Sequence, residues 1–386
     1  MNRWAWLGLF GFLFSTACDS GTLDPCDIRE PTCQRTVFVA VQRVRTVGWD
    51  PWLDMPPTRV ITENQFRNEL LRTNSTPSTS ESHFEATLEA FLLVDPERDP
   101  TAEVDALVAN YAAYYSQEDR TVTIIDHGSV DNLEYVTVVL AHEFVHAAQD
   151  RDLDLDTYSI PDTEDGWYAR SALVEGEATL YENLVFAEIR GFSVDEIDWD
   201  TYHETGIKRR RTQIAFSPSP YYDLRTLLYP LGSRYMTQRF LEGGAVAIRN
   251  AWRTPPKTTL EIISGESEQT PRSCGDPQPP SGYEAFYRLH MGAIPFYGLA
   301  TRVLEEEEAW STTLQLDTDT LWIFGSPTGQ TISVWDIRLR EDATTFAQAA
   351  HQRFDHVFQD GHRVVIMQAD LPEPSDWDDW MQCSTS

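Results

Sequence analysis

The stretch from residue 129 to residue 150 constrains the fold more than any other part of this 386-residue chain. It contains no Pro or Gly and includes the apolar run 135–141, so it predicts one uninterrupted helix. Asp131 and Glu134 are spaced as a variant of the capping box, which favours a helix start at this point. We expect the rest of the chain to be arranged around this helix.

The same stretch carries an H-E-x-x-H motif, formed by His142, Glu143 and His146. Residues four apart on a helix lie on one face with Cβ atoms about 5–6 Å apart. Both imidazoles can therefore reach one tetrahedral Zn²⁺ at about 2.0–2.1 Å. Glu143 would project beside the metal, where it can take a proton from a water. The competing interpretation is a pair of core histidines without a metal, because the pattern also arises by chance.

A third zinc ligand is expected, because two histidines hold the ion only loosely. Glu175 is the preferred candidate and Glu177 is the competing one. A loop with the breakers Pro161 and Asp165-Gly166 separates them from the first helix, and a second helix over about 168–189 can return them to the metal.

Small residues on one face of that second helix indicate a close helix contact. Gly176 costs a helix about 1 kcal/mol relative to Ala, so a packing reason is expected. We expect Gly176 to let the metal-bearing helix come close. The residues that share this face are Ala172, Gly176 and Thr179.

The two motifs resemble a known family. Residues 142–150 read H-E-F-V-H-A-A-Q-D and residues 172–178 read A-L-V-E-G-E-A, and both are similar to the gluzincin type of zinc metallopeptidase. The likeness is closer to a group of exported bacterial and archaeal H-E-x-x-H proteins, and it covers about residues 122–265. Many members carry Trp-Gly-Gly-Asp in their C-terminal part, where this chain has Glu308–Thr312. The resemblance therefore does not define the substrate cleft.

The resemblance implies a zincin-like fold that hydrolyses peptide bonds. It implies Glu143 as the catalytic acid/base. It also implies that the strand predicted over 121–126 lies near a sheet edge that pairs with an extended substrate, as in thermolysin-like proteins. The zinc ligands that it implies are His142, His146 and Glu175.

The oxyanion of such a reaction is stabilised by a Tyr, His or Arg side chain. A helix predicted over about 221–240 can bring Tyr229 into the cleft, and His203 is the second candidate. An ordinary core tyrosine is the preferred interpretation of Tyr229.

The charge of the chain excludes a nucleic-acid partner. There are 61 acidic against 30 basic residues, a formal net charge of −31, and such a surface repels polyanions. The acids are spread along the chain, which is typical of a solvated surface. The basic run 208–211 is interpreted as a solvated patch paired within the chain, with contact to an anionic surface as the alternative.

The N-terminal residues predict export. Residues 1–17 contain one basic residue, a short apolar stretch and small residues at the end, which is typical of a secretory signal. Cys18 follows Ser15-Thr16-Ala17, which resembles a bacterial lipobox with Ser in place of the usual Leu. We expect a lipid anchor at Cys18 in the bacterial cell envelope and a tether over 18–35. A secreted soluble protein is the alternative.

The cysteine count agrees with this interpretation. Of five cysteines, removing Cys18 to carry lipid leaves four, an even number in an exported chain. Cys26–Cys33 as a local clip and Cys274–Cys383 as a long closure is the preferred pairing.

The remaining patterns predict an α+β fold that is mainly α. The catalytic domain is expected over 36–265 and a C-terminal α+β subdomain, packed on it, over 283–386. Alternation predicts a strand over 36–48, and a capping box at Thr62 predicts a helix to about Arg72. The other predicted helices are 82–94, 100–115, 283–302 and 342–354, and the other predicted strands are 321–324, 331–339 and 363–368.

Taken together, the sequence predicts an exported, lipid-anchored, zinc-dependent peptidase acting on peptides or proteins. Two alternatives remain open. One is a surface lipoprotein with a structural zinc site and no catalysis. The other is a metallo-amidase that acts on cell-wall peptides.

Overall fold

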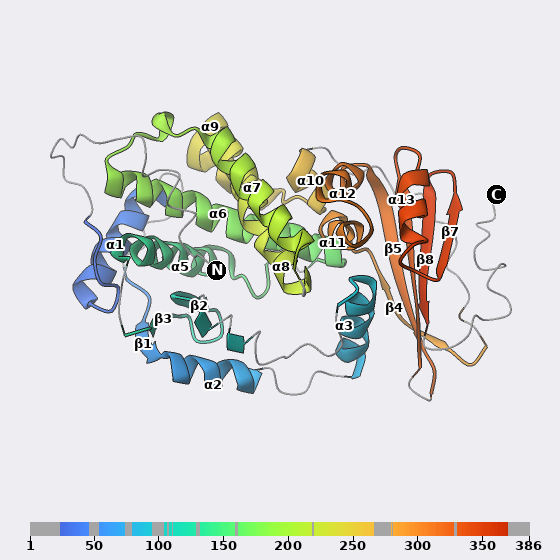
Figure 1. Ribbon diagram of the computed structural model, residues 1–386. Coiled ribbons are helices and arrows are strands. Elements are labelled where there is room, and N and C mark those ends of the chain that lie inside the picture. The colour runs from blue at the N-terminus through green and yellow to red at the C-terminus, as the bar shows by residue number, and fades with distance from the viewer. Residues whose placement is uncertain are drawn as a thin grey trace.

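The computed structural model confirms a mixed α+β fold in which helix predominates (Figure 1). Two long helices, α5 and α6, lie in a helical body, and a sheet lies at the end of the molecule far from α1 (Figure 1). The residues that the structure describes are 24–45, 54–73, 79–94, 104–105, 108–109, 111–128, 132–158, 161–217, 220–265, 279, 281–327 and 330–369.

The elements follow one another along the chain with helices first and most strands last. The helices are α1 (Pro31–Arg45), α2 (Glu63–Thr73), α3 (Thr79–Phe91), α5 (Leu133–Leu153), α6 (Glu164–Arg190), the 3-10 turn η1 (Val194–Glu196), α7 (Trp199–Ala215), α8 (Pro220–Thr226), α9 (Leu228–Arg253), α10 (Thr259–Ser264), α11 (Ala293–Val303), α12 (Glu306–Thr313) and α13 (Thr344–Ala350). The strands are β1 (Thr58–Thr62), β2 (Ala113–Ser116), β3 (Thr121–Asp126), β4 (Glu284–Leu289), β5 (Leu316–Gly325), β6 (Thr331–Leu339), β7 (His356–Asp360) and β8 (Arg363–Ala369).

The predicted helix with the H-E-x-x-H motif is confirmed as α5, but its cap differs from the prediction. Asn132 is the N-cap residue, and its side chain accepts a hydrogen bond from Tyr135 N–H. The cap predicted at Asp131 is thus displaced by one residue, to a side chain that satisfies the same kind of orphan donor. The predicted second helix is also confirmed, as α6, which starts earlier because Thr163 accepts from Gly166 N–H.

Gly176 allows a close helix contact, but the partner predicted for it is wrong. A Cβ atom added at Gly176 would lie 2.2 Å from the carbonyl carbon of Gly232, which is in α9 and not in α5. A Cβ added at Gly232 would lie 1.8 Å from the Ala172 carbonyl oxygen. Neither residue can carry a side chain without moving a backbone. The two glycines therefore set the separation of α6 and α9.

The strand predicted over 36–48 is wrong, because residues 31–45 form helix α1. Its apolar residues satisfy both periods: Val37, Val39 and Val41 recur at every second position, yet Val37 and Val41 also lie four apart and share a buried helix face. The predicted tether over 18–35 is also corrected for its described residues 24–35, since Ile28 and Cys33 are buried in the main core.

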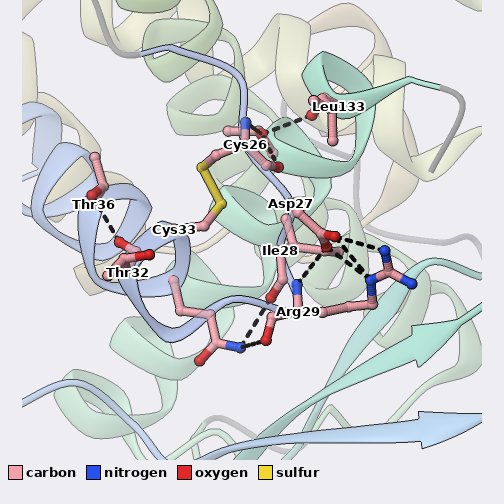
Figure 2. The surroundings of a disulfide bond; sticks show 10 residues. Cys26, Asp27, Ile28, Arg29, Thr32, Cys33, Thr36 and Leu133 are labelled. Atoms are coloured by element: carbon pink, nitrogen blue, oxygen red, sulfur yellow. Dashed lines mark hydrogen bonds and ion pairs between the residues drawn. A yellow bond between two sulfur atoms is a disulfide. The ribbon is translucent and has the colours of Figure 1, made fainter.

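The Cys26–Cys33 disulfide is confirmed, and it joins the first described residues to the start of α1 (Figure 2). The main chain of Cys26 also bonds to α5: its N–H donates to Thr137 Oγ1 at 3.1 Å. The disulfide thus fixes α1 beside the first turns of α5. The signal peptide, Cys18, Cys274 and Cys383 lie outside the described residues.

A three-stranded sheet lies below α5 and has the order β1-β3-β2 (Figure 1). The predicted strand over 121–126 is confirmed as β3, which lies at the centre of this sheet between β1 and β2. β2 occupies an edge, pairing antiparallel with β3 so that Tyr115 lies opposite Val122. The helix predicted over 100–115 is therefore wrong for residues 113–115.

The C-terminal sheet has five strands in the order β4-β5-β6-β8-β7. The predicted pairing of the strands near 321–324 and 331–339 is confirmed, with Leu321 opposite Trp335. The helix predicted over 283–302 is wrong at its start, because residues 284–289 form the edge strand β4 before α11 begins. Buried residues of this sheet and of the helical body belong to one hydrophobic cluster. None of the described helices is long and apolar enough to span a membrane.

Candidate metal centre

Three side chains predicted as zinc ligands converge on one point between α5 and α6. His142 Nε2 lies 2.9 Å from His146 Nε2, and Glu175 Oε2 lies 3.2 Å from the first nitrogen and 3.4 Å from the second. Ligand atoms bound tetrahedrally to Zn²⁺ at about 2.0–2.1 Å are separated by about 3.3 Å. The observed separations therefore match the spacing of a zinc ligand set. No other such group of His, Cys, Asp or Glu occurs among the described residues.

The partner of each Nδ1 atom determines which imidazole nitrogen carries the proton in His142 and His146. His142 Nδ1 lies 2.8 Å from Glu182 Oε2, a carboxylate oxygen that only accepts. His146 Nδ1 lies 2.9 Å from Gln149 Oε1, an amide oxygen that also only accepts. Both Nδ1 atoms therefore carry a proton, and the two Nε2 atoms that face the Glu175 carboxylate are left to bind either a further proton or a metal ion. Once both Nε2 atoms are deprotonated, the two imidazoles and the carboxylate form a set of three electron-pair donors that fits a metal ion.

Burial and charge perturb all three ligands. Burial disfavours the charged form of His142, but hydrogen bonds to Glu175 and Glu182 outweigh it and hold its pKa well above the usual range. Burial likewise opposes ionisation of Glu175, but the charge of His146 and hydrogen bonds from both histidines lower its pKa. The pocket thus keeps Glu175 ionised and attracts positive charge, whether protons or a cation.

Glu143 lies beside the ligand set and is held separately from it. Its side chain is 9% exposed, and its Oε2 accepts a hydrogen bond of 2.8 Å from the main-chain N–H of Tyr115 on β2. Burial raises its pKa, partly offset by the charges of His142 and His146. Glu143 is therefore a positioned carboxylate with the raised basicity that proton abstraction requires.

Tyr229, one of the two oxyanion candidates named from the sequence, packs against the ligand set. Its ring stacks on His142 with centroids 5.9 Å apart and an interplanar angle of 22°. The charge of Glu175 and burial raise its pKa well above the usual range. The phenol is thus protonated at neutral pH and can donate a hydrogen bond.

His203, the other predicted oxyanion candidate, lies in a different environment. Its ring stacks on Trp199 with centroids 5.8 Å apart, and its Nε2 lies 3.2 Å from Ser233 Oγ. Burial and the nearby charge of Arg234 lower its pKa to about 4, so the imidazole is neutral at neutral pH. None of its described contacts involves a residue of the metal centre.

Glu177, the competing third ligand, is placed away from the ligand set. Its side chain is fully buried and forms an ion pair with Arg45, with Oε1 to Nε at 3.2 Å. Its Oε2 accepts hydrogen bonds from Trp252 Nε1 and from Gln149 Nε2. The carboxylate is therefore occupied by its own donors, and Glu175 takes the place beside the histidines.

Four residues near the site were not predicted from the sequence. Gln149 and Glu182 could have been found, because they lie three residues after His146 and seven after Glu175 on the same helix faces. Tyr115 contributes a main-chain group from β2, which no sequence pattern indicates. The fourth is Tyr111, whose hydroxyl pKa is raised by burial and by the charges of Glu175 and Glu143.

No protein-family model, no curated protein and no solved structure matches this chain. The gluzincin resemblance therefore remains a prediction that rests on the two motifs. The donor geometry of His142, His146 and Glu175 is independent of it.

Proposed function

We propose that this protein is a zinc-dependent hydrolase that cleaves peptide bonds. The single observation that carries the proposal is the convergence of two imidazole lone pairs and one carboxylate, with Glu143 buried beside them. Zn²⁺ held by His142, His146 and Glu175 would act as a Lewis acid and lower the pKa of a water molecule.

Glu143 is the general base and acid of the proposed reaction. Its carboxylate takes a proton from the attacking water and gives it to the leaving amine. The Tyr115 N–H holds one carboxylate oxygen, and this leaves the other free to approach the water. Tyr229, whose hydroxyl keeps its proton at neutral pH, is the donor proposed for the oxyanion.

The edge of β2 supports a peptide as substrate. Ala112 O accepts from Ile125 N–H on β3, so the alternate residues Ala113 and Tyr115 turn their main-chain groups to the opposite side. Tyr115 N–H donates to Glu143 on that side. No described strand pairs with this edge. A peptide aligned there would form main-chain hydrogen bonds beside the catalytic carboxylate.

Export and a lipid anchor at Cys18 belong to the proposal as well. Their support is the N-terminal sequence and the Cys26–Cys33 disulfide, which is typical of oxidising compartments. Cys18→Ser should release the protein from bacterial membranes. Retention of the variant on membranes would contradict lipidation at this residue.

The deciding experiment compares zinc content and peptide hydrolysis in the wild type and in Glu143→Gln. We expect the variant to retain zinc and to lose about 10²–10⁴-fold in turnover, the usual contribution of a general base. Glu134→Gln is the matched control, because Glu134 lies on the same helix but pairs with Arg190 at the surface.

The outcomes separate the proposed function from its alternatives. Zinc in both proteins with no hydrolysis in either would support a structural zinc site and contradict the peptidase. Cleavage of peptidoglycan fragments but not of casein or peptides would support a cell-wall amidase. Equal turnover in the wild type and in Glu143→Gln would exclude Glu143 as the base.

A further inference from the structure

A buried chain of polar contacts leads away from His146 to the N-terminal helix. Its central member is Gln149, which is 0% exposed. The Gln149 amide nitrogen donates to Val174 O at 2.9 Å and to Glu177 Oε2 at 3.0 Å. Its oxygen faces His146 Nδ1 at 2.9 Å. Every polar atom of this amide therefore has a partner.

The partners of Gln149 allow only one orientation of its amide. A main-chain carbonyl and a carboxylate can only accept, so they must face the NH₂ group and not the oxygen. The oxygen is consequently fixed toward His146, whose Nδ1 must donate. The Nε2 atom of His146 is then left with its lone pair directed toward His142 and Glu175.

Glu177 is the anchor of this arrangement, and Arg45 makes the anchor stable. A carboxylate with 0% exposure needs charge compensation, which Arg45 supplies from the end of α1. Arg45 is itself held by Asp152 at 2.7 Å. Trp252 Nε1 donates to the same oxygen that receives the Gln149 amide, at 2.8 Å. The anchor thus ties together α1, α5, α6 and α9.

We propose that Gln149 is a positioning residue that sets the tautomer of His146, and that the Arg45–Glu177 ion pair keeps its amide in the required orientation. The proposal rests on the proposed metal site, because its consequence is tight zinc binding. A neutral amide can do this only if it cannot flip. The buried Arg45–Glu177 ion pair supplies that constraint, because Glu177 contacts Gln149, which in turn contacts His146.

The test uses the metal-free protein and two variants. In wild type, histidine-selective nitrogen NMR at a pH where the imidazoles are neutral should find His146 protonated at Nδ1. Gln149→Met removes the acceptor at similar volume, so His146 should show both tautomers. Competition with a chromophoric chelator should show that the zinc Kd of the variant rises about 10–100-fold, as for other lost outer-shell partners.

Glu177→Gln provides a second, independent variant. It removes the carboxylate charge and lets an amide NH₂ group face Gln149, so that only Val174 O still holds the Gln149 amide in its orientation. A smaller share of the second tautomer and weaker zinc binding should therefore appear. The matched control is Gln34→Met. Gln34 is an equally buried glutamine, 4% exposed, whose amide binds Ile28 O and Thr58 Oγ1 away from the metal centre. This control should leave the His146 tautomer and the zinc Kd unchanged.

The proposal is overturned if wild-type His146 is protonated at Nε2, or if Gln149→Met keeps both the tautomer and the zinc Kd of the wild type. It is also overturned if Gln34→Met weakens zinc as much as Gln149→Met does, because the effect would then follow lost stability. A wild type that binds no zinc would refute the proposed function. The tautomer measurement, made without metal, would still decide the role of Gln149.

Discussion

Buried charged side chains occur in the C-terminal sheet and around α5 and α6, but their hydrogen bonds are satisfied differently. In the sheet, Asp319 accepts from the main-chain N–H groups of Met291 and Gly292 and from Trp335 Nε1. Asp336 forms two contacts with the Arg363 guanidinium, of 2.9 and 3.0 Å. The carboxylates of Asp319 and Asp336 thus accept hydrogen bonds from donors within the protein itself.

In the helical body, the network around α5 and α6 has more hydrogen-bond acceptors than donors at the ligand set. Gln149 Oε1 accepts a hydrogen bond from His146 Nδ1 and Glu182 Oε2 accepts one from His142 Nδ1, so both Nε2 atoms face Glu175. A proton or a metal ion must lie between these three groups before their electron pairs are satisfied. The comparison teaches that a surplus of buried acceptors, and not burial of charge as such, distinguishes a ligand site from a structural network.

The largest effect that separates the two regions should come from breaking one buried ion pair in each. Arg363→Met leaves Asp336 uncompensated and should lower the free energy of unfolding by about 3–5 kcal/mol. Arg45→Met should cost a similar amount at Glu177. Only Arg45→Met should also weaken zinc binding. Denaturant unfolding and zinc titration measure the two quantities.

Equal zinc affinity in the two variants would break this comparison. It would mean that the Arg45–Glu177 ion pair, like the Asp336–Arg363 pair, contributes to stability only and not to zinc binding. The comparison would also fail if Arg363→Met, far along the chain from the ligands, weakened zinc as much as Arg45→Met.

A smaller effect is expected at the contact between α6 and α9. Gly176→Ala should lower the free energy of unfolding by about 1–3 kcal/mol or more, because the new methyl group meets the Gly232 backbone. Gly298→Ala is the control, since its Cβ would meet only leucine side-chain ends at 3.0 Å. Thermal unfolding of both variants should show that Gly176→Ala is the less stable of the two. A Gly298→Ala protein less stable than Gly176→Ala would contradict it.

The pH dependence should be the smallest effect, and it should change sign with zinc. Because the pKa of His142 in the metal-free fold lies above its unfolded value of 6.5, its contribution to stability is complete below pH 6.5 and is lost as the pH rises through the folded pKa. Zinc competes with that proton, so the apparent zinc Kd should rise about tenfold for each pH unit and proton as the pH falls. Calorimetry with and without zinc tests both directions. The prediction would be contradicted if the stability of the protein changed with pH in the same direction with and without zinc.

The helices that carry the site are predictable from the sequence because their signals are local. His142 and His146 share a face by helix periodicity, and Glu175 follows on the next long helix. Gln149 is within the same local range. Tyr115 is not, because it reaches Glu143 through a main-chain N–H from a strand 28 residues away.

The errors in the fold also have a physical origin. Short apolar runs satisfy helix and strand periods together, so α1 is predicted as a strand. The partner of Gly176 depends on how α9 packs, which a glycine alone does not specify. The order of the small sheet, in which β1 and β2 pair on either side of β3, is likewise set by long-range packing that no local pattern specifies.

Zinc analysis of the purified protein, compared between wild type and His146→Ala, tests the central claim most directly. The geometry predicts one zinc ion per wild-type chain and its loss in His146→Ala, with Gln34→Met retaining the metal as the folded control. A wild type that takes up no zinc, or a His146→Ala protein that binds zinc as tightly as the wild type, would contradict the assignment of His142, His146 and Glu175 as a metal centre.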